Sequence, residues 1–204
     1  MVTCAQELYN TWLPFIGDSR TLSAPSRCWR FAWVKLKSPA PVLINHRDAC
    51  LSCKAYDGLD EDGRILILIT SHTNRPEDGK ELDCPDGGPR TVRVNVKRAA
   101  VSLVPLVNGG TRIAAMAHID PLLDHFPAWL VNWVATKVCY VGVWQWNRHA
   151  RRIAAGDDKG QHRQAMRANP SLYDWIADRV SGCKRTERAV RYFGGAVGEE
   201  SHSP

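Results

Sequence analysis

Three residues in one short segment have the types and spacing that acid/base chemistry requires: Arg112, His118 and Asp120. Side chains separated by an even number of residues share one face of a β-strand, so these groups would stand together and could exchange a proton inside a cavity. The sequence has no nucleophile elbow, metal-binding triad or phosphate-binding loop to complete an active site. We therefore predict no catalytic residues and no enzymatic activity, and we interpret His118 as a histidine of the core or its rim.

A second candidate for chemistry is the C-x-x-C pair Cys50 and Cys53, with His46 nearby. Zinc would need a second pair of ligands at matching spacing, and Cys84 alone does not supply it. Residues three apart on a strand also point to opposite faces. We predict neither a metal nor a cofactor. Because the seven cysteines are odd in number and irregularly spaced, we expect reduced thiols in a cytoplasmic protein.

The charge of the chain is unevenly distributed. The formal net charge is +6, and the whole excess lies between Trp144 and Phe193. A basic helical surface of this kind can face anionic lipid headgroups, although a solvated helical face has the same composition. No zinc-finger, RNP or helix-turn-helix signature accompanies the charge, so nucleic acid is not an expected partner. We divide the chain into a domain at residues 4–154 and a basic helical tail at 155–204 with a disordered end.

The elements that must position these residues follow an α+β order. The apolar pattern predicts a short helix at residues 4–15 and a long helix from Ala128 onward. Lys97 and Arg98 interrupt the alternation of one strand, where one extra residue would form a bulge and bend the sheet. The expected structure is therefore a curved antiparallel sheet closed by one long helix. Its strands are predicted at residues 28–37, 47–56, 64–72, 92–103 and 111–120.

The predicted long helix carries two stripes and almost no charge. Pro127 stands at its start, where a missing N–H costs nothing. Lys137 near the middle would cost about 2.5–3.5 kcal/mol in a bilayer, so a membrane span is disfavoured against a buried core helix or an interfacial helix. The aliphatic stripe comprises Leu130, Val134, Val138 and Val141, and the aromatic stripe comprises Trp129, Trp133, Tyr140 and Trp144.

The run Ile65 to Ile69 is apolar at every position. In an antiparallel sheet, such a strand leaves neither face to water. One face would pack on a helix while the other lines an internal cavity, or both faces would be buried in a core. The run is therefore a candidate wall for an apolar ligand.

Five stretches of the chain together carry a resemblance to a known family. On their order and spacing, the chain resembles the START domain, the steroidogenic-acute-regulatory-related lipid-transfer fold, over roughly residues 8–146. Its best markers are Pro41, the Arg47-Asp48 pair, Ser71-His72 with Pro76, Asp120-Pro121, and Pro127 with residues 129–132. The last stretch is most similar to the end of phosphatidylcholine transfer proteins. The stretches are PAPVLINHRDACLSCKAYDG, ILILITSHTNRP, VRVNV, VPLVNGGTRIAAMAHIDP and FPAWLVNWVATK.

This resemblance implies a helix-grip fold, in which a curved sheet wraps around the long C-terminal helix and one phospholipid or sterol fills the tunnel between them. It also implies a lid that loosens during transient contact with a membrane surface, which the basic tail suggests is anionic. We take Arg47, Asp48, Arg112 and His118 as polar cavity candidates, and Trp129, Trp133 and Trp144 as membrane contacts. The candidate cavity lining is Ile65, Ile67, Ile69, Val101, Leu103, Met116, Leu130, Val134, Val138 and Val141.

Two departures from the family pattern bear on these expectations. Family members carry a helix and about three strands before the matching region, so the N-terminal part of the domain is expected to be missing. Several members also place a buried arginine six residues after the arginine of the Arg-Asp pair, where this chain has Cys53. Two alternatives therefore stay open beside a lipid carrier: a helix-grip enzyme resembling hydrolases or cyclases, and a regulatory module that binds a partner instead of a lipid.

Overall fold

The computed structural model describes residues 6–72, 82–106, 109–123, 126–156 and 160–182. The N-terminal segment forms η1 (Gln6–Leu8) and α1 (Tyr9–Trp12), and the later helices are α2 (Ala128–Ala154), α3 (Gln161–Ala168) and α4 (Pro170–Gly182). The strands are β1 (Ile16–Ser26), β2 (Trp29–Leu36), β3 (His46–Gly58), β4 (Arg64–Ser71), β5 (Thr91–Arg93), β6 (Asn95–Pro105) and β7 (Thr111–Asp120).

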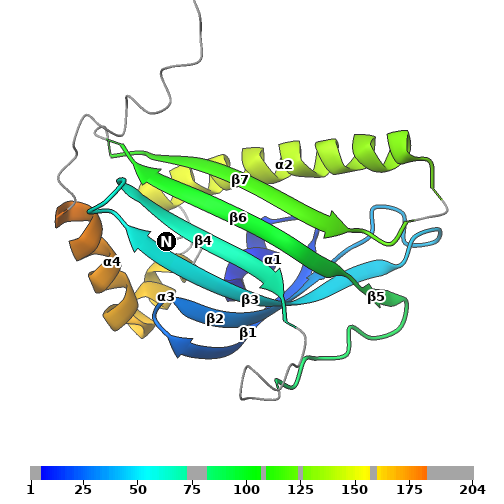
Figure 1. The fold of residues 1–204 in the computed structure, drawn as a ribbon, viewed down its shortest axis with the longest axis horizontal. Coiled ribbons are helices and arrows are strands. Elements are labelled where there is room, and N and C mark those ends of the chain that lie inside the picture. Colours follow the sequence, from blue (N-terminus) through cyan, green and yellow to red (C-terminus); the bar gives the residue numbers. More distant parts are fainter. Residues whose placement is uncertain (1–5, 73–81, 107–108, 124–125, 157–159, 183–204) are drawn as a thin grey trace, which may run out of the picture.

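A single sheet organises the fold, with the strand order β1-β2-β3-β4-β6-β7 (Figure 1). Neighbouring strands on this path are antiparallel, and the short β5 pairs with β3 in parallel. The predicted bulge is confirmed, since the register of β6 against β7 shifts between Val96 and Arg98. The helix-grip α+β class is therefore confirmed, with a seven-stranded sheet and a long C-terminal helix.

The sequence prediction was wrong at the N-terminal end. The expected helix at residues 4–15 is limited to η1 and α1, and the chain then enters β1, a strand that the sequence pattern did not reveal. β1 reads IGDSRTLSAPS, which has no apolar alternation, and its pairing with β2 contains three register shifts. Its strand conformation therefore comes from pairing with β2 more than from its own residues.

The helices define one face of the sheet, here called the helix side. Gln6 of η1 reaches the Cys53 sulfur of β3, and Trp12 of α1 stacks on His149 of α2 with ring centroids 4.9 Å apart. His149 in turn contacts His162 of α3, at 4.8 Å between centroids. Because directly paired residues of an antiparallel sheet share a face, Cys53 identifies the helix-side positions on every strand. The opposite face is called the outer side.

The C-terminal helices lie at the end of the sheet where β3 joins β4 (Figure 1). Arg179 of α4 forms ion pairs with Asp57, at 2.5 Å, and with Asp60, at 2.7 Å. Leu172 and Tyr173 of α4 are buried. The first part of the tail predicted at 155–204 is thus packed onto the domain, and its last residues, 183–204, lie outside the described residues.

Candidate ligand-binding site

One wall of the candidate site is the helix side of β4, β6 and β7. Register places Ile65, Ile67 and Ile69 of β4 opposite Leu103, Val101 and Ala99 of β6, so these side chains share the helix side. The same rows continue onto β7 as Ile113, Ala115 and Ala117. The β4 and β6 members of these rows are only half-buried, and the β7 members are exposed. Five of the residues predicted to line a cavity therefore share one apolar surface: Ile65, Ile67, Ile69, Val101 and Leu103.

The other wall is α2. Phe15 lies against Gly142, where an added Cβ would come within 3.4 Å of the phenyl ring, and Trp12 contacts Trp146. These contacts attach the second half of the helix to the helix side. Although α2 has 27 described residues, none of its side chains is fully buried. Leu130 and Val134 are half-buried, while Val138 and Val141 are 39% and 37% exposed.

The aromatic stripe of α2 is separate from this wall. Trp129, Trp133, Tyr140 and Trp144 are all at least half exposed. A cation lies beside two of the rings: Lys137 over Trp133, at 5.9 Å, and Arg148 over Trp144, at 5.3 Å. Indole rings with adjacent cations suit an interface that is apolar on one side and polar on the other. Within the described residues, no helix combines the length and apolarity that crossing a membrane demands.

Arg47 connects the sheet to the segment that leads into α2. Its guanidinium donates through Nε to the Pro121 carbonyl, at 2.9 Å, and through Nη2 to the Leu122 carbonyl, at 3.2 Å. A third donation reaches the Asn45 carbonyl, at 2.6 Å, in the loop before β3. Partial burial lowers the pKa of Arg47 from its ordinary value. Arg47 thus holds together two loops at the entrance to α2.

Asp48 follows Arg47 in the chain and points to the outer side. Its carboxylate is 2% exposed and accepts hydrogen bonds from Trp33 Nε1, at 2.8 Å, and from Arg93 Nη2, at 2.6 Å. Burial alone would raise the pKa of Asp48, but the hydrogen bonds from Arg93 and Trp33 outweigh it and hold the pKa below its ordinary value. Asp48 is therefore an ionised anchor of the outer side, away from the apolar wall.

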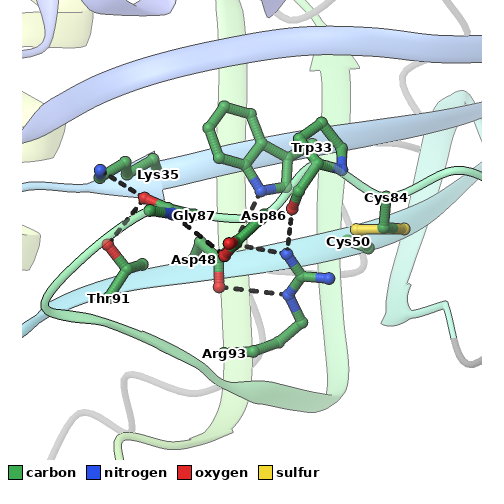
Figure 2. A network of polar contacts seen from close by, with 11 residues as sticks. Trp33, Lys35, Asp48, Cys50, Cys84, Asp86, Gly87, Thr91 and Arg93 are labelled. Carbon is green, nitrogen blue, oxygen red and sulfur yellow. Dashed lines mark hydrogen bonds and ion pairs between the residues drawn. A yellow bond between two sulfur atoms is a disulfide. The ribbon is translucent and has the colours of Figure 1, made fainter.

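The segment before β5 covers this anchor. Lys35 Nζ and Thr91 Oγ1 both donate to the Gly87 carbonyl, at 2.6 Å and 2.8 Å (Figure 2). A side chain at Gly87 would bring its Cβ to 2.8 Å from the Asp48 carboxylate, so the close approach requires glycine. The resulting network joins β2, β3 and β5.

The expectation of reduced thiols was wrong for one pair of cysteines. Cys50 and Cys84 form a disulfide with a Cα–Cα distance of 6.3 Å, within the normal range (Figure 2). Cys53 lies on the other face of β3, as its spacing from Cys50 predicts, and burial raises the pKa of its thiol to about 11. Among the described residues, Cys53 and Cys139 are free thiols. The disulfide ties the covering segment to β3.

Besides Asp48, three more predicted site residues lie on the outer side. The register of β6 against β7 puts Arg112, Met116 and His118 opposite Val104, Ala100 and Arg98, which all point away from the helices. Met116 is 68% exposed. Arg112 and His118 do share a face, as the sequence indicated, but that face is separated from the apolar wall by the sheet.

Sequence reasoning missed the contacts that hold the helices in place. The rings of Trp12, His149 and His162 form a continuous series of contacts between α1, α2 and α3, and His162 is 2% exposed. The ion pairs of Arg179 were also missed. No positive signal in the sequence could have found these contacts, because the spacing of the aromatic residues does not indicate which of them meet.

This arrangement, a sheet gripping a long C-terminal helix with apolar walls on both, is the fold of START domains, and comparison with solved structures supports this. The chain is similar to a STAR-related lipid transfer protein from Xanthomonas axonopodis, with a TM-score of 0.52 and 18% identity over 74% of this chain and 76% of that one. No protein-family model matches the sequence, and no curated protein is similar enough in sequence to match.

Two human structures show the same fold. Human STARD10 aligns with a TM-score of 0.63 and 13% identity over 89% of this chain, and human StAR-related lipid transfer protein 5 aligns with a TM-score of 0.57 and 18% identity over 70% of it. The alignments cover 65% and 64% of the human chains. The predicted START fold is confirmed by these matches. The missing N-terminal part and the similarity to phosphatidylcholine transfer proteins stay predictions.

Proposed function

We propose that this chain is a non-enzymatic lipid carrier, which holds one phospholipid or sterol between the helix side of β4, β6 and β7 and the aliphatic stripe of α2. The observation that carries this proposal is the exposure of α2. A helix with a continuous aliphatic stripe normally buries it, yet Val138 and Val141 keep more than a third of their surface exposed opposite an apolar sheet. An aliphatic ligand lying between these walls would remove both surfaces from water.

The chemistry of the walls supports a lipid in preference to a polar ligand. In the facing rows the residues contributed by β4 and β6 are aliphatic, and those of β7 are Ile113, Ala115 and Ala117. Such walls leave no polar group to be paired, so acyl chains or a sterol ring system could be covered without an unsatisfied donor or acceptor. We leave Asp48, Arg112, Met116 and His118 out of the proposed lining because they lie on the outer side.

The entrance is the loop at residues 38–45 together with the start of α2. Val42 and Leu43 at the tip of this loop are 82% and 78% exposed, and Trp129 is 70% exposed. Arg47 links the two parts through the carbonyls of Asn45 and Pro121. In our proposal this apolar rim meets the membrane, with the Trp residues of α2 at the headgroup level, and opens to admit or release the lipid.

The test is to purify the chain, extract bound lipid and identify it by mass spectrometry, and then to measure transfer between vesicles. Fluorescent phosphatidylcholine and a fluorescent sterol serve as separate probes, with donor vesicles of phosphatidylcholine alone or mixed with phosphatidylserine. We expect about one lipid per chain and faster transfer from the anionic vesicles. Protein that is free of lipid and transfers neither probe would contradict the proposal, and hydrolysis of a bound ester would favour the enzyme.

A matched pair of variants locates the site. Val138→Asp places a carboxylate in the proposed apolar wall, and Val143→Asp makes the same change on the same helix at a position that is 71% exposed. We expect the first variant to lose at least about 90% of its bound lipid, because an unpaired charge against an acyl chain is strongly unfavourable. The second variant should keep its lipid. Circular dichroism checks that both variants fold.

A further inference from the structure

The apolar wall of the sheet has two ends that differ in construction. In our proposal the entrance lies at the start of β3, where Arg47 holds the loops before α2. The other end, here called the far end, lies at Asp57, ten residues further along the same strand. At about 3.3 Å per residue, the two ends are about 33 Å apart. A chain-like ligand that enters beside Arg47 therefore runs toward Asp57.

Asp57 stands in the last row of this wall. Asp57 and Cys53 are four residues apart on β3, so both side chains point to the helix side. Register continues the row from Asp57 through Ile65 of β4 to Leu103 of β6. Ile65 and Leu103 are only half-buried. Apolar surface that a ligand could cover thus continues up to the row of Asp57.

The helices α3 and α4 connect both walls at the far end (Figure 1). Arg179 of α4 donates through Nε to Asp57, at 2.5 Å, and through Nη2 to Asp60 in the following turn, at 2.7 Å. On the other wall, His149 of α2 contacts His162 of α3. Because α3 and α4 pack together, the pair spans the distance from α2 to the sheet. The far end is therefore the end at which a structural element crosses from one wall to the other.

Two kinds of contact fix α4 in this position. Leu172 and Tyr173 of α4 are 4% and 7% exposed, and Leu59, in the turn between β3 and β4, is 4% exposed. The hydrogen bond from Arg179 also holds the pKa of Asp57 below its ordinary value, because it favours the ionised carboxylate. Displacing α4 would expose buried apolar side chains and separate two ion pairs at once. A ligand that pushes against α4 therefore meets a firm barrier.

We propose that α4, held in place by Arg179, is the end wall of the lipid site and sets the longest acyl chain that the site accepts. This role rests on the proposed function and narrows its ligand to phospholipids with acyl chains of limited length. A chain that reaches Ile65 and Leu103 buries its last methyl group there. Each further methylene group has to displace α4 or stay in water, so it adds strain without adding burial. Arg179 is a positioning residue, because it acts through α4.

Competition between acyl-chain lengths tests the end wall. The full chain is equilibrated with vesicles containing equal parts of dioleoyl, dierucoyl and dinervonoyl lipids, each as phosphatidylcholine and as phosphatidylethanolamine. Mass spectrometry of the protein-bound fraction gives the ratio of dinervonoyl, the longest, to dioleoyl, the shortest. Arg179→Glu repels α4 from Asp57 and Asp60, so it should raise this ratio at least about fivefold over the original chain. The total amount of bound lipid should not fall.

Three further variants make the result specific. Arg167→Glu makes the same charge change at an exposed position of α3 and should leave the ratio unchanged. Asp57→Lys breaks the ion pair from the side of the sheet and should raise the ratio as Arg179→Glu does. Leu103→Trp adds bulk to the last row and keeps the ion pairs of α4, so it should lower the ratio at least about fivefold. Circular dichroism checks folding, and Leu103→Trp decides the question if the α4 variants unfold.

The outcomes separate the end wall from the function on which it rests. If the original chain, Arg179→Glu and Leu103→Trp all bind phospholipid with the same length ratio, the end wall is overturned and the carrier stands. Binding of a fluorescent sterol without binding of any phospholipid has the same meaning. A chain that binds neither class of lipid contradicts both the end wall and the carrier.

Discussion

Two regions of the molecule are packed in opposite ways: the outer side of β2 and β3, here called the closed side, and the surface of β7 and α2, here called the open side. On the outer side of β2 and β3, Trp33, Asp48 and Cys50 are each no more than 3% exposed, and a disulfide and a buried ion pair hold the covering segment in place. On the side of β7 and α2, apolar residues such as Ile113 and Val138 remain about 40% exposed. The residues of the first region are fully packed, whereas the second region keeps apolar surface exposed.

This difference assigns a separate role to each region. A polar network with charged hydrogen bonds fixes the position of β3, because a buried carboxylate tolerates little displacement from its donors. The apolar walls have no such directional contacts, so ligands of different shape can be accommodated between them. The closed side thus acts as the scaffold, and in our proposal the open side is where the lipid enters and leaves.

Removal of the disulfide should have the largest effect on this contrast. We expect Cys84→Ser to lower the free energy of unfolding by about 3 kcal/mol, because a crosslink between residues 34 apart restricts the unfolded chain. Urea unfolding followed by tryptophan fluorescence measures the loss, and a dithiol reductant should produce the same loss in the unaltered chain only. Cys139→Ser, an exposed thiol on α2, is the control and should change nothing. An unchanged urea midpoint under reductant would show that the closed side does not depend on this bond.

Loss of the buried Asp48 carboxylate should have the second largest effect on the free energy of unfolding. Asp48→Asn keeps the shape of the side chain but removes the charge that pairs with Arg93, and we expect a loss of about 2.5 kcal/mol. The loss is smaller than for a fully buried pair, since the Arg93 side chain is 43% exposed. Chemical denaturation at neutral pH measures it. A variant as stable as the original would mean that Trp33 and Arg93 are satisfied without the charge.

The same variant makes a pH prediction. The pKa of Asp48 in the folded chain lies below its ordinary value of 3.8, so the stabilisation is fully present above that value and disappears as pH falls through the lowered pKa. The stability difference between the original chain and Asp48→Asn should therefore shrink from about pH 5 to about pH 2. A difference that stays constant over this range would exclude the ionised carboxylate as its source.

The smallest effect comes from a matched pair of valines, one in the packed core beside β3 and one on α2. Val94 is 6% exposed and packs with Ala49 and Val96, whereas Val138 on α2 is 39% exposed. Val94→Ala should cost about 2 kcal/mol through lost burial and a small cavity. Val138→Ala should change the stability of lipid-free protein by less than about 0.5 kcal/mol, because alanine also favours the helix. Thermal and urea unfolding of the two variants measures both changes in stability. Equal losses of stability would mean that α2 is packed as tightly as the core.

Local pattern predicted most of the sheet and the long helix. The period-two alternation of β6 and β7 identified both strands, and the change of phase after Val96 correctly located the bulge. Such patterns work because a strand or helix repeats its exposure at short range. β1 was not predicted because its residues are mostly polar or small, and it is a strand only through its pairing with β2.

The candidate site was harder to predict than the fold, for a reason that β7 illustrates. Alternation shows that Met116 and His118 share a face, but it does not show which face the helices cover. That choice depends on contacts between distant segments, such as Gln6 with Cys53 and Trp12 with His149. The Cys50–Cys84 bond was missed for the same reason, since its two halves meet only once the segment before β5 has folded over β3.

The stack of Trp12 on His149 also determines the order of events during synthesis. The α1 helix emerges from the ribosome early, but the residues that receive it belong to the second half of α2, near the end of the described chain. Strands β1 to β4 can pair while the rest is still being made, because their connections are sequential. The apolar row of β4 is then exposed until α2 is released, so the nascent chain passes through a stage at which a chaperone has an isoleucine-rich strand to bind.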